Sequence, residues 1–365
     1  MRIRYEIDGD KRAEYNSMQY KEKKFILKGY EGEELEYNPV LRLDSTFDQT
    51  RFKVVLLNSK NSAENNIYIV QVKNSNNWER IGWIFPVQAL LSKEHSQAEN
   101  IHFLRYAYVA TYILLEKAEV VKESDDPEEL FLDQLYDSEK IILVIDNDNT
   151  DTIDGFDIEN YVIGLYKYGY TWEGEITPFV DIPESIENNP GKIKLECISH
   201  DLRSVPIINV LFKDQLSRNI NGVLRFYWCY QIIELLIQEI FKNDFQKQLS
   251  SVEDNIDSLF EIKEKINDLT GEKFRIRELF NQYTNGRGLS SGKELAEACG
   301  YFLSHLNRKT DDDAPSMLYS VRCILVHNMY VLGTENTPIM EHMIEDINVE
   351  FTKVLMNILF SFHCT

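Results

Sequence analysis

The stretch LRFYWCYQIIELLIQEIF, residues 224–241, is apolar on almost every side of a helix. A surface helix needs only one apolar stripe, so this composition predicts a helix that is buried on several sides. Beyond Pro206, helical periods are long, and Gly and Pro are confined to the positions between them. We therefore expect residues 206–365 to form an all-α domain. After the helix within 211–247, amphipathic patterns predict further helices at 252–268, 272–283, 292–306, 316–332 and 338–362.

The first half of the chain has a different period. Apolar and polar residues alternate in β-branched runs, which predict antiparallel strands at 24–30, 39–44, 51–57, 66–72 and 80–85. Helices are expected at 100–121 and 127–135, and IILVI at 141–145 predicts a buried strand. The fold class expected is α+β. An N-terminal α+β domain of unknown role, 1–205, is followed by an all-α helical bundle, 206–365.

Length and composition exclude several classes of protein. At 365 residues the chain is long enough for two domains, and it has no uncharged apolar run of the roughly 18 residues that span a bilayer. The N-terminus lacks the apolar core of a secretory signal, so we expect a cytoplasmic protein with no membrane partner. Its five cysteines are scattered without a CxxC pair, which favours reduced thiols over disulfides or a zinc site.

Charge is unevenly distributed along the chain. The net charge is −21, of which −16 lies in residues 121–190. We expect this acidic block to face away from a nucleic-acid site or to shield it. Residues 273–309 carry +4, and we expect Lys273, Arg275 and Arg277 to contact RNA there. The alternative is a modest positive excess on solvated helices.

The most informative segment is SMLYSVRCILVHNMYVL, residues 316–332. At roughly 100° per residue, one apolar stripe contains Leu318, Val321, Leu325, Met329 and Leu332, and a second contains Tyr319, Cys323, Val326 and Tyr330. A helix with two apolar faces predicts packing on two sides. Arg322 and His327 flank the second stripe, roughly 140° apart. We expect a homodimer through this second face; packing against 338–362 is the rival explanation.

The same segment resembles a known family. Arg322, four residues, His327 and then Asn328 are similar to the signature of the HEPN superfamily, all-α domains that are mostly RNases. RFYWCYQIIELL at 225–236 resembles the Tyr-rich first long helix, with an embedded Glu, of many bacterial members. The resemblance covers about residues 206–365. It implies cleavage of RNA without a metal or other cofactor at a homodimeric site, often by toxins or antiviral-defence effectors.

The residue types suit this chemistry. RNA is cut by its own 2′-hydroxyl when a base removes the hydroxyl proton and a cation stabilises the charge on the phosphate. His327 and Arg322 are the candidate catalytic residues, supported by Cys323 and Asn328. Glu234 lies among apolar neighbours and needs a cationic partner, for which Arg322 and Arg225 are the candidates. A structural helix-bundle role for the His and the Arg is the other interpretation.

Two alternatives stay open. Many active HEPN members place Asn, Asp or His directly after the Arg, where this chain has Cys323. The alternative function is therefore a non-catalytic module that binds a nucleotide or a protein. Its N-terminal domain would recognise an unknown trigger or regulator. IILVIDNDNT at 141–150 resembles the first motif of haloacid-dehalogenase-like phosphatases, with Asp146 as nucleophile. An acidic turn is favoured, because acidic loop and helices follow instead of an α/β domain.

Overall fold

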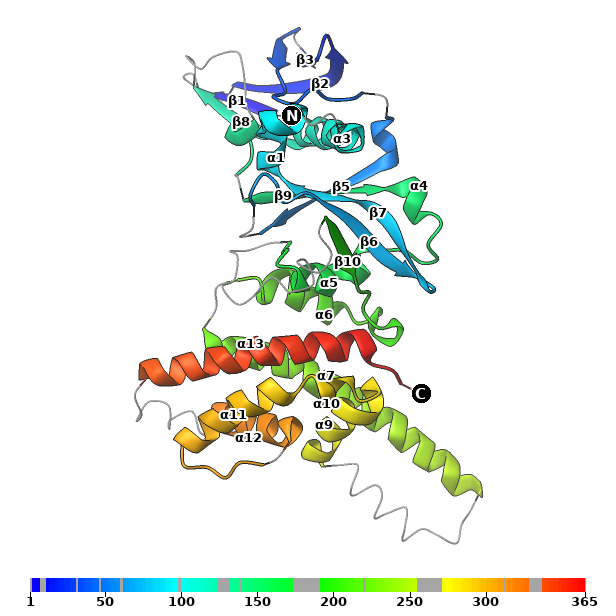
Figure 1. Cartoon of the computed structure of the whole chain (residues 1–365), viewed down its shortest axis with the longest axis vertical. Helices are drawn as coiled ribbons and strands as arrows, with labels where there is room; N and C mark the ends of the chain where they lie inside the picture. Colours follow the sequence, from blue (N-terminus) through cyan, green and yellow to red (C-terminus); the bar gives the residue numbers. More distant parts are fainter. Residues whose placement is uncertain are drawn as a thin grey trace. The chain divides into compact units, whose positions relative to one another are not determined.

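The computed structural model describes most of the chain (Figure 1). Residues 1, 7–10, 31, 46, 60–61, 98–99, 124–131, 138, 173–190, 219–220, 255–270, 312, 328–336 and 365 lie outside the described residues. Residues 127–131 of the expected helix 127–135 and most of the expected helix 252–268 fall on these residues, as do parts of the acidic block. Of the expected helix 127–135, the described part contains only the 3-10 turn Leu132–Gln134. The remaining chain is α+β, with a sheet-rich N-terminal region and a helical C-terminal region, as the sequence predicted.

The described chain divides into two compact units. The sheet-rich unit contains residues up to 158, 168–172 and 191–195; the helical unit contains 159–167 and 196–364. This division differs from the expected boundary at residue 205. Tyr166 explains part of the difference, because its buried ring packs edge-on against Phe212 and its hydroxyl accepts a hydrogen bond from Arg225 at 3.3 Å. Residues 159–167, which lie well before the expected boundary, therefore belong to the helical unit.

Among its described residues, the sheet-rich unit has two five-stranded sheets. The first has the order β4-β3-β2-β1-β8, antiparallel except for the parallel pair β1 and β8. Its strands are β1 (Arg2–Glu6), β2 (Lys11–Lys21), β3 (Lys24–Gly29), β4 (Glu34–Tyr37) and β8 (Glu119–Glu123). The expected helix 100–121 therefore ends too late: the helix stops at Lys117, and 119–121 belong to β8.

The second sheet has the order β10-β6-β7-β9-β5, and only β10 and β6 are parallel. Its strands are β5 (Phe52–Asn58), β6 (Tyr68–Asn74), β7 (Asn77–Pro86), β9 (Lys140–Asp146) and β10 (Lys192–Leu195). The buried strand expected at 141–145 is confirmed, since β9 lies between β7 and β5 and all five residues are buried. Residues 39–44, expected to be a strand, form none, although Leu41 and Leu43 are buried.

Helix α3 (Ile101–Lys117) lies between the two sheets (Figure 1). Asn100 begins it by accepting a hydrogen bond from the amide of Phe103 at 3.2 Å. Tyr108 stacks on Phe25 of the first sheet, and Tyr106 contacts Phe52 of the second edge-on. Burial against both sheets explains why α3 is apolar on most sides. The short helices of this unit are α1 (Val87–Leu91), α2 (Lys93–Gln97) and α4 (Asn147–Thr150).

The helical unit is arranged around α7 (Gly222–Asp254), the helix that the opening stretch predicts. Phe226 of α7 packs on Phe351 of α13 (Thr337–Ser361), and α13 (red) crosses beside α7 in Figure 1. The two helices run in the same direction, since Asn348 donates to the carbonyl of Gly222 and Thr352 lies beside Cys229. The other helices are α5 (Val162–Lys167), α6 (Pro206–Val210) with the π-helical turn Leu211–Gln215, α9 (Glu272–Asn281), α10 (Arg287–Ser290), α11 (Lys293–His305) and α12 (Ala314–His327).

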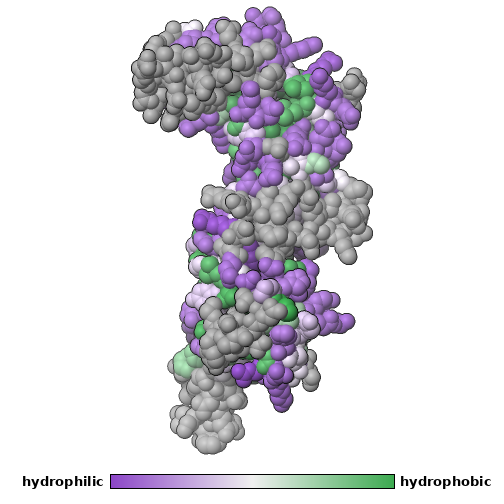
Figure 2. Space-filling view, turned by 90° about the vertical axis from the view of Figure 1, so that its left-hand side faces the viewer, coloured by the Kyte–Doolittle hydropathy of each residue, from purple (hydrophilic) through white to green (hydrophobic). Residues whose placement is uncertain are grey.

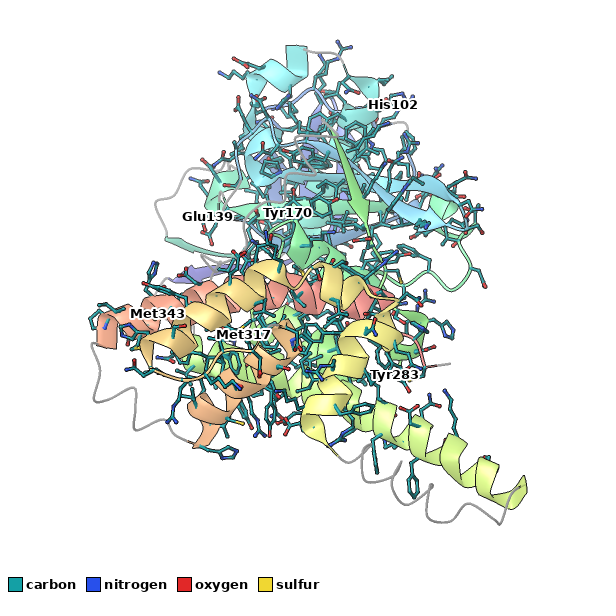
Figure 3. The ribbon with its side chains drawn as sticks, turned by 60° about the horizontal axis from the view of Figure 1, so that its bottom comes forward. His102, Glu139, Tyr170, Tyr283, Met317 and Met343 are labelled. Atoms are coloured by element: carbon teal, nitrogen blue, oxygen red, sulfur yellow. The ribbon has the colours of Figure 1, made fainter. Side chains whose placement is uncertain are left out.

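The core of this unit is closely packed. Met317 of α12 and Met343 of α13, both labelled in Figure 3, are buried, as are Phe302 of α11 and Phe280 of α9. All five cysteines are free.

On the face drawn in Figure 2, hydrophilic residues prevail among those described, with small separated hydrophobic areas. In the part of the chain that the structure describes, no helix combines the length and apolar character needed to cross a membrane.

Candidate active site

Three helices meet around the guanidinium of Arg322. Arg322 and His327 come from α12, Glu234 and Tyr230 from α7, and Glu272 is the first residue of α9. Nη2 of Arg322 donates to Oε1 of Glu234 at 2.9 Å, and Nη1 lies 3.0 Å from Nε2 of His327. Nε lies 3.9 Å from Oε1 of Glu272. We call these five residues the Arg322 cluster.

The start of α12 is fixed to α9. Oδ1 of Asp313 accepts a hydrogen bond from the amide of Ser316 at 2.7 Å, the arrangement of a helix N-cap. Its other oxygen, Oδ2, accepts from Arg277 of α9 at 2.8 Å, and Arg277 also donates to the Ser316 hydroxyl at 3.0 Å. This double attachment sets where α12 begins relative to α9, and therefore where Arg322 meets Glu272.

The first apolar stripe of α12 is buried, as predicted. Leu318, Val321 and Leu325 are at most 4% exposed, and the helix packs on α11 and α9. Met329 and Leu332, the other two expected members, lie outside the described residues. Because this stripe anchors α12 in the core, Arg322 is held at the edge of the buried face, where its side chain is only 18% exposed.

The second apolar stripe is incompletely covered. Tyr319 and Cys323 are half-buried, and Val326 is 44% exposed; Tyr330 falls outside the described residues. The rival explanation was that 338–362 covers this face. Helix α13, which spans most of that range, packs on α7 and α11, and Val326 stays exposed. Within the described chain, an apolar surface therefore lies beside Arg322.

The short contact between Arg322 and His327 shows which imidazole nitrogen faces the guanidinium. Because a guanidinium has only donors, Nε2 of His327 can only act as the acceptor in this contact. The imidazole is exposed at the last residue of α12. An exposed imidazole nitrogen that accepts a hydrogen bond next to a fixed cation is suited to the role of a general base.

Arg322 remains charged in this setting. Burial opposes the charged form, but the hydrogen bond that Arg322 donates to Glu234 and the nearby charge of Glu272 outweigh it, so the pKa of Arg322 is raised. Its Cζ lies 5.6 Å from the centre of the Tyr230 ring, a cation–π contact. Two carboxylates thus surround one cation, and the charges of Glu234, Glu272 and Arg322 sum to −1.

Two tyrosines complete the polar surroundings. The hydroxyl of Tyr230 donates to Oε1 of Glu272 at 2.9 Å; burial and then the Glu272 charge raise the pKa of Tyr230. Tyr319 is hydrogen-bonded to Cys323 one turn later, and this contact is the main reason that the pKa of Tyr319 is raised. The Cys323 thiol therefore has a polar neighbour on α12 itself. Asn328, the other expected supporting residue, lies outside the described residues.

Glu234 is held from two sides. Of the two cations that the sequence offered as its partner, Arg322 contacts it, whereas Arg225 donates to Tyr166 and to the carbonyl of Arg218. Oε2 of Glu234 accepts from the Gln231 amide at 2.7 Å. This second bond fixes the carboxylate on the surface of α7, so that its other oxygen faces Arg322.

The expected RNA contacts lie on α9, and each cation contacts the protein itself. Lys273 pairs with Asp311 at 2.8 Å, and Arg277 pairs with Asp313. Arg275 lies over the Phe241 ring, with its Cζ 5.4 Å from the ring centre, and donates to the carbonyl of Ile237. These contacts attach α9 to its neighbours, so RNA binding by the three cations would have to compete with them.

Glu272, Tyr230 and Gln231 also contribute to the site, although no pattern in the sequence indicates them. Glu272 follows Gly271 at the first position of α9, where an acid is favoured by the helix dipole, and nothing local distinguishes it from a capping acid. Tyr230 was noticed only as one of several aromatic residues in a helix. Their role depends on the approach of α9 and α12 to α7, which the linear sequence does not display.

The second motif, at Asp146, forms a structural ion pair. Asp146 is buried, and both of its oxygens accept from Arg51 at 2.6 Å. Oδ1 also accepts from the amide of Asp148, so the carboxylate caps the short helix α4. Asp148 in turn contacts Arg51 at 2.9 Å. This arrangement fits the acidic turn that the sequence favoured over a phosphatase nucleophile.

The fold and the site define an α+β protein whose helical unit carries an Arg–His–Glu cluster on three helices. Among the residues described, no group of three or more His, Cys, Asp and Glu side chains is arranged to hold a metal ion. No model of a known protein family, no curated protein and no solved structure matches the chain.

Proposed function

We propose that the protein is a metal-independent endoribonuclease, in which His327 is the general base and Arg322 stabilises the reacting phosphate. The observation that carries this proposal is the 3.0 Å contact between Nη1 of Arg322 and the acceptor Nε2 of an exposed His327. A structural histidine would be expected inside the bundle, whereas this one lies on its surface next to a charged guanidinium. The resemblance of this segment to the HEPN signature supports the same function.

The proposed reaction is a transesterification. A phosphate oxygen accepts the hydrogen bond of Arg322 Nη1, which leaves Nε2 of His327 able to take the proton of the adjacent 2′-hydroxyl. The 2′-oxygen then attacks phosphorus and the bond to the 5′-oxygen breaks. The products are a 2′,3′-cyclic phosphate and a 5′-hydroxyl, whose proton comes from a general acid or from water. Glu234 holds Arg322 in place and takes no part in the proton transfer.

A second copy of the chain would bring a second Arg322 and His327 to the same site. The surface of Tyr319, Cys323 and Val326 lies beside Arg322 and is partly exposed, so its association across a two-fold axis would cover apolar area and juxtapose two clusters. We propose this homodimer as the active form. In the cell we propose a cytoplasmic toxin or antiviral-defence effector, with a sensor or recognition role for the N-terminal unit.

The decisive experiment is a cleavage assay on total RNA in the presence of EDTA. The wild-type chain should cut, and His327→Ala and Arg322→Ala should each lower the rate by at least 100-fold, the scale of general-base and oxyanion contributions. His305→Ala is the matched control, because His305 is also an exposed histidine at the last residue of a helix, α11. Cleavage at the wild-type rate by either variant would exclude the assignment.

One observation favours a second candidate. Glu234 and Glu272 both neutralise Arg322, and a net charge of −1 disfavours phosphate binding. A non-catalytic module that binds a nucleotide or a partner protein needs no phosphate at this position. It predicts that the wild-type chain binds a ligand through the helical unit and does not cut RNA under any of the conditions above.

A further inference from the structure

A pocket of about 230 Å³ lies on the helical unit between α6, the π-helical turn after it and α7. Its lining residues are Ile207, Ile208, Leu211, Gln231, Ile232, Glu234, Leu235 and Gln238. Gln231, Ile232, Glu234 and Leu235 of this lining belong to the stretch 225–236 that the sequence analysis compares with the HEPN first helix. The pocket shares one residue, Glu234, with the Arg322 cluster.

The lining combines an apolar floor with a polar rim. Ile208, Leu211 and Ile232 are almost fully buried. Gln231 and Glu234 are half-buried, and Gln238 is exposed. Pockets for drug-sized ligands occupy roughly 300–1,000 Å³, so this one suits a smaller, flat group. A nucleobase has two apolar faces and a polar edge, and proteins recognise unpaired RNA bases by packing on the faces and by hydrogen bonds to the edge.

Glu234 connects the pocket to the proposed phosphate position. Its Oε2 accepts from Gln231 at 2.7 Å, on the pocket rim, and its Oε1 accepts from Arg322 at 2.9 Å. A nucleotide whose base occupies the pocket would therefore have its sugar and phosphate next to Arg322. Glu234 is thus the residue that the base pocket and the proposed phosphate site have in common.

We infer that this pocket binds one nucleobase of the RNA and thereby determines where the chain is cut. The inference rests on the proposed ribonuclease function. The charged group of the rim is a carboxylate, which only accepts hydrogen bonds. An exocyclic amino group is a matching donor, whereas the one donor on the edge of uracil, N3–H, lies between two carbonyl oxygens that a carboxylate repels. The pocket therefore selects bases with an amino group, A, C or G, over U.

The first test measures binding of nucleoside monophosphates to the full-length chain by titration calorimetry. CMP should bind at least fivefold more tightly than UMP, and Ile207→Ala and Gln238→Ala should each remove this difference. Gln246→Ala is the matched control, because Gln246 is an exposed glutamine on the same helix outside the pocket. Equal affinities of the wild-type chain for CMP and UMP would overturn the inference.

The second test maps cut sites on a random-sequence RNA for the same variants. Wild type and Gln246→Ala should cut next to A, C or G, and Gln238→Ala should cut with less preference. Cleavage with an unchanged base preference in both pocket variants overturns the pocket and leaves the nuclease intact. Absence of cleavage by the wild-type chain, together with binding of CMP that depends on Gln238, refutes the nuclease and supports the pocket.

Discussion

At the scale of single residues, the balance of charge around Arg322 determines what the cluster can bind. Glu234 has a clear positioning role, because Gln231 fixes it and it holds the guanidinium. Glu272 is different: it lies 3.9 Å from Nε of Arg322 without a hydrogen bond and is occupied by the Tyr230 hydroxyl. Its negative charge opposes a phosphate more than it positions the arginine.

Glu272→Gln should therefore strengthen RNA binding. The amide keeps an acceptor for Tyr230 and removes one negative charge, so the net charge of the cluster rises from −1 to zero. We expect the affinity to rise by a few-fold, on the order of 1 kcal/mol at low salt, and less at high salt because the charges are screened. Fluorescence anisotropy of a labelled RNA, in the His327→Ala background to prevent cleavage, measures it. Glu294→Gln, an exposed acid on α11, is the control; equal or weaker binding by Glu272→Gln than by this control would contradict the model.

At the scale of elements, the position of α12 depends on its cap. Asp313 accepts from the Ser316 amide and pairs with Arg277, and these contacts outweigh its partial burial, so the pKa of Asp313 is lowered. Asp313→Ala should cost about 1 kcal/mol of unfolding free energy, a usual value for an N-cap. Because its pKa is lower in the folded state, the stabilisation is present above the unfolded pKa, near 4, and is lost as the pH falls through the folded value.

Denaturant unfolding at pH 7 and pH 3 measures this effect. The difference between wild type and Asp313→Ala should be present at pH 7 and smaller at pH 3. Asp311→Ala is the control, since Asp311 lies in the same loop and pairs with Lys273 without capping α12. A difference for Asp313→Ala that is equal at both pH values would show that its charge does not stabilise the cap.

Local sequence patterns predict a helix or strand when the contacts that stabilise it are close in the sequence. They fail when those contacts come from residues far away in the chain. The strand β9 and helices α9, α11 and α13 follow from periodicity. By contrast, 119–123 were expected to be partly helical but pair with β1, more than 100 residues away. The sequence patterns predicted no strand at the positions of β1, β2 and β4. Leu41 and Leu43 alternate as in a strand and are buried, yet their backbone pairs with no strand.

The candidate site shows the same distinction. Arg322 and His327 are five residues apart, and Glu234 was identified as a carboxylate among apolar neighbours that needed a partner. Glu272 and Tyr230 became members only because α9 packs on both α7 and α12. The pocket beside Glu234 depends on α6, whose exposed Ile207 looks in the sequence like any residue of a short connecting helix.

At the scale of the whole molecule, the remaining question is how the exposed stripe of α12 is covered. An apolar face beside a charged cluster is costly to leave in water, and the described part of the chain covers it only in part. Self-association is the proposed cover, because it also places a second Arg322 and His327 near the first. If two chains together form one active site, loss of the dimer and loss of cleavage should occur together.

Val326→Asp tests this coupling. At a two-fold interface the new carboxylate would lie next to the same carboxylate of the second chain, so the two charges would repel each other and lose hydration. The variant should therefore be a folded monomer at micromolar concentration by light scattering. Its cleavage rate should fall by at least tenfold.

Ile339→Asp is the matched control, because the two side chains are almost equally exposed: Ile339 of α13 is 43% exposed and Val326 is 44% exposed. The control should keep both the dimer and the rate, and near-native circular dichroism of both variants excludes unfolding as the cause. A wild-type monomer that still cleaves RNA would show that each chain carries a complete site, and Arg322 and His327 would then act without a second copy.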